Sequence, residues 1–136
     1  MTSDQPLSEV KILLIENDRD TVELFRFVLQ AEGAHVVAVF SVREALSVLS
    51  VNQFNIVLFE PRLSDGEGYL FIEALRRGEL GDNQHLPVVA VTASVRQVDR
   101  EQARTVGCQE FLPKPVDLSN LIDVVLRLVA VPPVVD

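Results

Sequence analysis

The chain has 136 residues, which suffice for one domain with a sizeable core but not for two comfortable domains. Its hydrophobic fraction of 48% excludes wholesale disorder, and its formal net charge of −8 disfavours the basic surface of a nucleic-acid-binding protein. A single cysteine excludes an internal disulfide, and no apolar run reaches the roughly 20 residues that span a bilayer, so we expect a cytoplasmic protein without membrane attachment.

Short apolar runs predict five strands. Four of the runs are nearly continuous in Val, Ile and Leu, which is typical of interior parallel strands that are covered on both faces. A fifth run is weaker. In chain order they span residues 10–15, 35–40, 55–59, 87–93 and 110–112.

Segments with helical character follow each strand. Ser41 and Glu44 have the spacing of a capping box that opens the second helix, and Ser94 and Gln97 are candidate caps for a fourth helix that ends at Gly107. Gly33 is placed to end the first helix, and Asp117 precedes the fifth. Apolar residues with helical spacing mark four of the helices. They are Val22, Phe25, Val28 and Leu29 in the first helix, Ala45, Leu46 and Leu49 in the second, Leu70, Phe71 and Leu75 in the third, and Leu118, Leu121, Ile122, Val125 and Val129 in the fifth. We expect the set in the second helix to point inward.

Strand and helix therefore alternate five times. This order predicts an α/β domain with a doubly wound, five-stranded parallel sheet, right-handed crossovers and helices on both faces. We place the domain at residues 10–130, between a flexible N-terminal segment at 1–9 and a C-terminal tail at 131–136. Ligand sites of such sheets lie at the carboxyl ends of the strands.

Polar residues occur at those predicted strand ends. Each of them alone would most simply be a solvated loop residue, or a helix cap in the case of Asp18. Together they form a set of carboxylates, a hydroxyl and an ammonium group, which suits a hard cation and a phosphoryl group. The set consists of Glu16, Asn17 and Asp18 after the first strand, Glu60 after the third, Thr92 at the end of the fourth and Lys114 after the fifth.

Four segments carry a more specific pattern, namely residues 12–18 (ILLIEND), 56–68 (IVLFEPRLSDGEG), 88–93 (VVAVTA) and 111–116 (FLPKPV). As a set they resemble the receiver domains of two-component response regulators, and the resemblance extends over about residues 10–130. It implies a flavodoxin-like fold, similar to CheY, with strand order 2-1-3-4-5 and five helices.

The resemblance also implies roles for residues. The family's phosphoacceptor aspartate corresponds to Glu60, and its Mg²⁺ ligands correspond to Glu16, Asn17 and Glu60, with Asp18 as a further candidate. The hydroxyl that contacts the phosphoryl group corresponds to Thr92.

Two more positions follow from the same resemblance. Lys114 corresponds to the lysine that pairs with the acceptor carboxylate, and the Lys114–Pro115 peptide bond is expected to be cis. Phe111 corresponds to the aromatic residue that swings inward when the hydroxyl moves; it is also a plausible plain core residue.

Two departures from the family pattern predict a degenerate site. The extra methylene of Glu60 displaces the carboxylate by about 1.5 Å, which is costly for in-line phosphoryl transfer. Asn17 replaces a charged ligand with a neutral amide, so we expect at most weak Mg²⁺ binding. Glu60 then either imitates part of a phosphoaspartate or pairs with Lys114 and locks one resting conformation, and we favour the second alternative.

We therefore predict a stand-alone pseudo-receiver that has no enzymatic activity and acts by binding a sensor histidine kinase or another signalling protein. A homodimer through the face of the fourth helix, fifth strand and fifth helix, where Val95, Val98 and Val106 supply apolar positions, is as plausible as a simply solvated face. A functional phosphoacceptor with an unusual site is the first alternative. A flavodoxin-like cofactor binder or small hydrolase is the second, disfavoured because the loop at residues 16–20 is acidic and lacks glycine.

Overall fold

A computed structural model describes residues 5–63, 68–94 and 96–130 of the chain. In this part of the chain, strands and helices alternate as predicted, and a short 3₁₀ turn, η1, lies before β4. The elements are β1 (Lys11–Ile15), α1 (Arg19–Ala31), β2 (His35–Val39), α2 (Val42–Leu49), β3 (Ile56–Phe59), α3 (Gly68–Arg76), η1 (Gly81–Asn83), β4 (Val88–Thr92), α4 (Gln97–Val106), β5 (Glu110–Pro113) and α5 (Leu118–Ala130).

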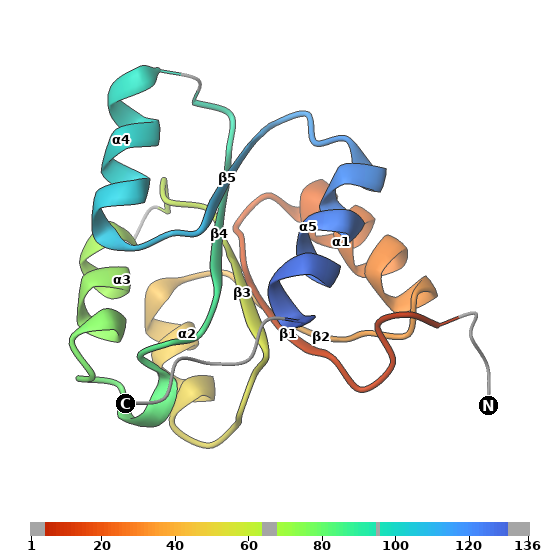
Figure 1. The fold of residues 1–136 in the computed structure, drawn as a ribbon, viewed down its shortest axis with the longest axis horizontal. Coiled ribbons are helices and arrows are strands. Elements are labelled where there is room, and N and C mark those ends of the chain that lie inside the picture. Colours follow the sequence, from red (N-terminus) through yellow and green to blue (C-terminus); the bar gives the residue numbers. More distant parts are fainter. Residues whose placement is uncertain (1–4, 64–67, 95, 131–136) are drawn as a thin grey trace.

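The five strands form one parallel sheet in the order β2-β1-β3-β4-β5. All residues of β3 and β4 are buried, which confirms that these apolar runs are interior strands covered on both faces. Because all strands are parallel, their carboxyl ends lie along the same edge of the sheet, at its upper end in Figure 1. The predicted fold class and strand order are confirmed.

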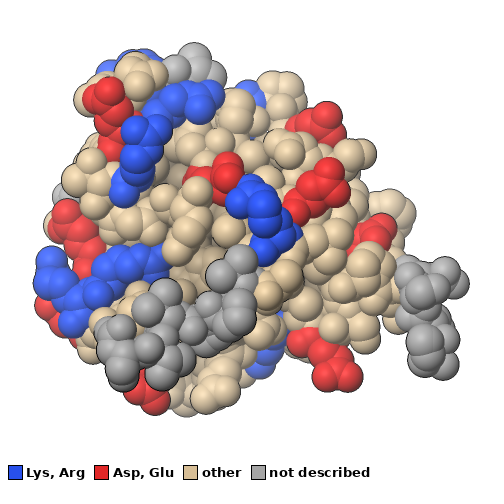
Figure 2. All heavy atoms as spheres, in the orientation of Figure 1, with Lys and Arg blue, Asp and Glu red and all other residues tan. Residues whose placement is uncertain are grey.

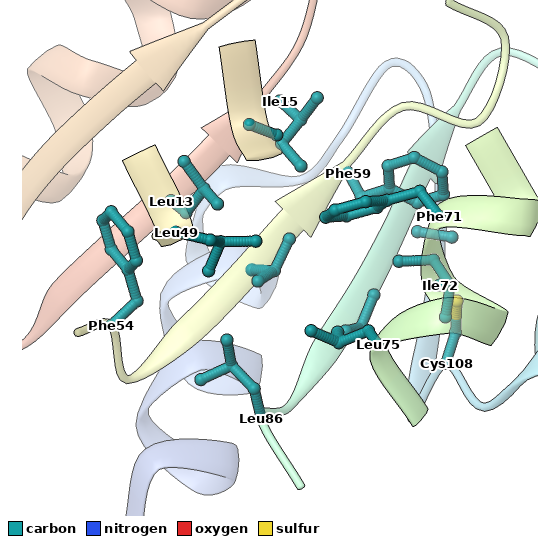
Figure 3. Packing of buried hydrophobic residues seen from close by; sticks show 14 of the residues in the cluster. Leu13, Ile15, Leu49, Phe54, Phe59, Phe71, Ile72, Leu75, Leu86 and Cys108 are labelled. Carbon is teal, nitrogen blue, oxygen red and sulfur yellow. The ribbon is translucent and has the colours of Figure 1, made fainter. Parts of the chain in front are cut away.

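Helices cover both faces of the sheet, with α2, α3 and α4 on one side and α1 and α5 on the other (Figure 1). Alternate residues of a strand face opposite sides. Thus Val57 and Phe59 of β3 belong to the core beneath α2, α3 and α4, whereas Ile56 and Leu58 belong to the core beneath α1 and α5. Figure 3 shows the first core, in which the ring of Phe59 packs beside Phe71 of α3. The residue that follows Phe59 is therefore held at a rigid strand end.

The predicted signals for helix ends are largely confirmed. The side chain of Ser41 accepts a hydrogen bond from the amide of Glu44 at 3.1 Å, and the Glu44 carboxylate accepts one from the amide of Phe40 at 2.6 Å. Gly33 and Gly107 follow α1 and α4 with φ of +99° and +112°, the left-handed conformation that glycine adopts without strain.

The predicted start of α4 is wrong. Its N-cap is Arg96, without a capping side chain, and the helix begins at Gln97. Ser94 instead donates a hydrogen bond from its hydroxyl to Asp99 in the first turn of α4. The spacing of Ser94 and Gln97 was misleading because Ser94 lies two residues before the N-cap and contacts the carboxylate of Asp99.

Two predicted sets of apolar helix positions differ from the buried residues. Leu46 is 42% exposed, so α2 directs only Ala45 and Leu49 into the core. In α5 the buried residues are Leu121, Val124, Val125 and Leu128, while the predicted positions Ile122 and Val129 are only partly buried. Apolar spacing predicts that a helix has an inner face, but the packing on the sheet decides which residues that face contains.

The N-terminal segment is anchored to the domain at Leu7. Leu7 is completely buried in the core beneath α1 and α5, and its amide donates to the carbonyl of Glu32 at 2.8 Å. The prediction of a flexible segment is therefore wrong for Leu7. Val95 and the predicted tail at 131–136 lie outside the described residues.

Candidate functional site

Lys114 connects the polar residues at the carboxyl ends of the strands. Its ammonium nitrogen, Nζ, lies 2.9 Å from Oε1 of Glu16 and 3.2 Å from Oε1 of Glu60. These three residues follow β1, β3 and β5, which are distant in the sequence. The predicted meeting of the three strand ends is confirmed, and we refer to Glu16, Lys114 and Glu60 as the ion cluster.

The backbone fixes both carboxylates of the ion cluster. The amide of Glu16 donates to the carbonyl of Val39 at 3.0 Å, and that of Glu60 donates to the carbonyl of Ile15 at 2.9 Å. The second oxygen of each carboxylate, Oε2, accepts a hydrogen bond at 2.9 Å from a backbone amide two residues on, which is Asp18 for Glu16 and Arg62 for Glu60. Each carboxylate therefore uses one oxygen for Lys114 and the other for the backbone.

Lys114 approaches the site from the end of β5. Its amide donates to the carbonyl of Thr92 at 2.9 Å, which aligns the loop after β5 with the end of β4. The peptide bond between Lys114 and Pro115 is cis, as predicted.

Burial and opposite charge shift the pKa values of the ion cluster in opposite directions. The Glu16 side chain is only 1% exposed, and this burial raises the pKa of its carboxyl group in spite of the Asp18 amide and Lys114. Burial alone would lower the pKa of Lys114, but the hydrogen bonds and charges of Glu16 and Glu60 outweigh it, and the pKa of Lys114 is raised. The ammonium form of Lys114 is therefore favoured in the folded protein.

The side chains of Thr92 and Phe111 make contacts outside the ion cluster. Thr92 is 1% exposed, and its hydroxyl oxygen accepts a hydrogen bond from the amide of Ser94 at 3.3 Å. Phe111 is partly buried, and the guanidinium carbon of Arg100 lies 4.9 Å from the centre of its ring. In the described part of the chain, no hydrogen bond joins Thr92 to Glu60.

The donors present fit a tightly bound Mg²⁺ poorly. The carboxylate of Asp18 accepts hydrogen bonds from the amide and the hydroxyl of Thr21, so it caps α1, as one of the two alternatives for Asp18 anticipated. Asn17 is exposed and neutral. Between Glu16 and Glu60 stands an ammonium group, and the described residues contain no cluster of three or more acidic, histidine or cysteine side chains suited to a metal. Lys114 already contacts one oxygen of each of these two carboxylates.

Comparison with known proteins identifies the family. A family model for the response regulator receiver domain matches residues 12–126. The chain belongs to the response regulator receiver family. This membership places the receiver in two-component signalling and leaves the cofactor-binding and hydrolase alternatives without support.

Relatives of this receiver have similar lengths. It is 35% identical over 130 residues to an uncharacterized 14.6 kDa protein of Leptolyngbya boryana, covering 95% of this chain and 98% of the relative. It is 26% identical to the polar-differentiation response regulator DivK of Brucella ovis, over 84% of this chain and 91% of that protein. No helix in the described residues is both long and apolar enough to cross a membrane.

Solved structures agree on the fold. The receiver domain of Francisella response regulator 1452 superposes with a TM-score of 0.81 at 20% identity, covering 90% of this chain and 98% of that one. The receiver domain of the sensor histidine kinase PA1611 from Pseudomonas aeruginosa, determined with a magnesium ion in its active site cleft, superposes with a TM-score of 0.80 at 24% identity over 90% and 98% of the two chains.

Sequence reasoning did not find how the Thr92 loop is attached to α4. The carboxylate of Asp99 accepts hydrogen bonds from Ser94 and Arg96. Ser94 was noticed only as a helix cap. The spacing of five residues between Ser94 and Asp99 was a weak signal, because it crosses the start of the helix.

Proposed function

We propose that this chain is a stand-alone pseudo-receiver that signals by binding another protein and does not accept a phosphoryl group on Glu60. The ion cluster carries this proposal, because Lys114 contacts Glu16 and Glu60 at the same time. Receiver domains are generally signalling modules without enzymatic activity of their own, and we extend that to this chain.

The contacts of Glu60 support the loss of phosphoryl acceptance. One carboxylate oxygen contacts Lys114 and the other accepts the Arg62 amide, so both candidate nucleophilic oxygens are engaged. The longer side chain also moves the carboxylate by about 1.5 Å relative to aspartate. Phosphoryl transfer depends on the alignment of donor and acceptor, so both effects act against it.

The residues that correspond to the family's Mg²⁺ ligands support the same conclusion. In the family the metal neutralises phosphoryl charge; here we propose that Glu16, Asn17 and Glu60 hold it only weakly. Asp18 does not compensate, since its carboxylate caps α1. The ammonium of Lys114 already supplies positive charge at this position.

Between the two roles considered for Glu60, the contacts favour a locked resting conformation. A phosphoaspartate mimic would be expected to engage Thr92, but the Thr92 hydroxyl contacts Ser94 instead. Glu60 is held by Lys114 and the backbone. We propose that the ion pair keeps Thr92 and Phe111 in one arrangement.

We propose a sensor histidine kinase or another cytoplasmic signalling protein as the partner, and α4, β5 and α5 as a surface for it or for a second copy of the chain. Figure 2 shows basic side chains on the side of the molecule where α3 and α4 lie, with acidic ones among them. On α4, Val98 is 59% exposed and Arg104 is exposed. Charges around an apolar position favour one docking orientation.

A phosphodonor experiment tests the proposal. Wild type, Glu60→Asp and Glu60→Ala are incubated with Mg²⁺ and acetyl phosphate, and intact mass is measured for an addition of about 80 Da, the mass of one phosphoryl group. We expect no addition in wild type or Glu60→Ala and a gain in Glu60→Asp. If Glu60→Asp also fails, the double variant Asn17→Asp/Glu60→Asp should gain the group, because it restores the metal ligand as well.

The competing function is a working phosphoacceptor with an unusual site, which the position of Glu60 beside Lys114 favours. An addition of about 80 Da to wild type that is lost in Glu60→Ala would establish that function and refute the pseudo-receiver.

A further inference from the structure

We propose that Asp99 is a positioning residue that ties the first turn of α4 to Thr92 and thereby sets the position of α4 in the partner surface. The role in partner binding rests on the function proposed above. The physical connection between Thr92 and α4 does not, and it can be measured in the free protein.

Asp99 is held by residues that precede its helix. Its Oδ2 accepts hydrogen bonds from the hydroxyl of Ser94 and from Nε of Arg96 at 3.0 Å, while its Oδ1 accepts one from Nη2 of Arg96 at 3.1 Å. The Asp99 side chain is 17% exposed, whereas that of Arg96 is 72% exposed. Water can readily replace the exposed arginine, so the contact with Ser94 is the more specific attachment.

Ser94 also contacts Thr92. It is 8% exposed, and its amide donates to the hydroxyl oxygen of Thr92 at 3.3 Å. Two successive hydrogen bonds therefore lead from the Thr92 hydroxyl through Ser94 to the Asp99 carboxylate. The pKa of Asp99 is lowered, first by the Ser94 hydroxyl and then by Arg96, as expected for a carboxylate held in its charged form.

The start of α4 lacks a capping side chain at its N-cap, which gives the Asp99 contacts more weight. Most helices begin with a side chain that caps the free amides, but Arg96 at the N-cap provides none. Asp99, which lies within the first turn, instead fixes that turn through its contacts with Ser94 and Arg96. The next residue, Arg100, lies over the ring of Phe111, so two consecutive residues attach α4 to the end of β4 and to β5.

The test uses three single alanine variants of the free protein and one double variant, Ser94→Ala/Asp99→Ala. Asp99→Ala and Ser94→Ala each remove one partner of the connection. Glu101→Ala is the matched control, because Glu101 is an exposed acid on the same helix whose carboxylate accepts a hydrogen bond from Gln97 at 3.2 Å. Thermal unfolding checks that all four variants remain folded, and amide hydrogen exchange and NMR chemical shifts are then recorded.

In Asp99→Ala and Ser94→Ala we expect about tenfold faster exchange of the amides in the first two turns of α4. We also expect shifted NMR signals for the methyl group of Thr92 and for the groups next to its hydroxyl. The control should change neither. In the double variant the acceleration should stay near tenfold, because both substitutions break the same connection; independent effects would multiply to about 100-fold.

Thr92 signals that move no more in Asp99→Ala than in Glu101→Ala, or a multiplied acceleration in the double variant, would overturn the proposal. Neither phosphodonor nor partner is present in this experiment. Its failure would therefore leave the pseudo-receiver proposal untouched, and phosphorylation of Glu60 in the mass experiment would leave the connection through Asp99 untouched.

Discussion

Replacing Lys114 with methionine is expected to lower the free energy of unfolding by about 3–5 kcal/mol at pH 7. Methionine keeps much of the volume of lysine but removes the ammonium group that contacts Glu16 and Glu60. The side chains of Glu16 and Glu60 are only 1% and 8% exposed, so water cannot fully replace the lost ion pairs. Urea unfolding followed by circular dichroism measures the change.

Lys11→Met is the matched control. The Lys11 ammonium donates to the neutral amide oxygen of Asn52 at 3.0 Å, so its removal leaves no carboxylate without a partner. We expect a loss of less than about 1 kcal/mol for this variant. Equal losses in Lys11→Met and Lys114→Met would show that the ion cluster adds nothing beyond an ordinary lysine contact.

The loss in Lys114→Met should also depend on pH. The pKa of Lys114 is raised above 10.5 in the folded protein, so the stabilisation by its ammonium is complete below pH 10.5 and disappears as the pH rises through the folded value. The pKa of Glu16 is raised above 4.5, so ionisation of this carboxyl group works against folding as the pH rises from that value. Protonation of Glu16 should therefore remove one of the two unpaired charges in Lys114→Met, and the difference between wild type and Lys114→Met should shrink at pH 4.

The second large effect is expected at the opposite end of the sheet, for Arg76→Met. The Arg76 guanidinium donates to the carbonyls of Gly107, Gln84 and Leu86 at 2.7–3.1 Å and to the side chain of Gln109 at 3.1 Å. These acceptors lie on the segments that precede β4 and β5. Arg76 thus joins the end of α3 to two strand starts, and burial lowers its pKa because the charged form loses water.

Removing this guanidinium leaves partly buried carbonyls without donors, so we expect Arg76→Met to lose about 3 kcal/mol of unfolding free energy. The neighbouring Arg77 provides the control. Its side chain is 57% exposed and pairs with the similarly exposed Glu79, so Arg77→Met should change stability by less than about 1 kcal/mol. A small effect of Arg76→Met in the same urea titration would mean that solvent or backbone movement satisfies these carbonyls.

The sequence predicted the sheet and the meeting of its strand ends because both follow from the chain order of apolar runs. Five strands alternating with helices permit few topologies, and a parallel sheet brings every carboxyl end to one edge. The contacts of Lys114 with Glu16 and Glu60 follow from that geometry. The family pattern supplied the strand order, which alternation alone leaves open.

The remaining features depend on packing that no local pattern encodes. Leu46 fits the apolar spacing of α2, but an eight-residue helix covers the sheet with a narrow stripe, which includes Ala45 and Leu49 and omits Leu46. Arg76 gave no signal because its acceptors come from separate loops. Asp18 fitted both a metal ligand and a helix cap by residue type, and the cap became visible only through its contact with Thr21.

The ion cluster of Glu16, Lys114 and Glu60 is tested most directly by the ¹H–¹⁵N NMR spectrum of the wild-type protein, recorded before and after addition of Mg²⁺ and acetyl phosphate. If Lys114 holds both carboxylates and the site accepts no phosphoryl group, the amide signals of Glu60, Thr92 and Lys114 stay where they are with Mg²⁺ alone when acetyl phosphate is added. A second set of signals for these residues that appears only with the phosphodonor would contradict the pseudo-receiver.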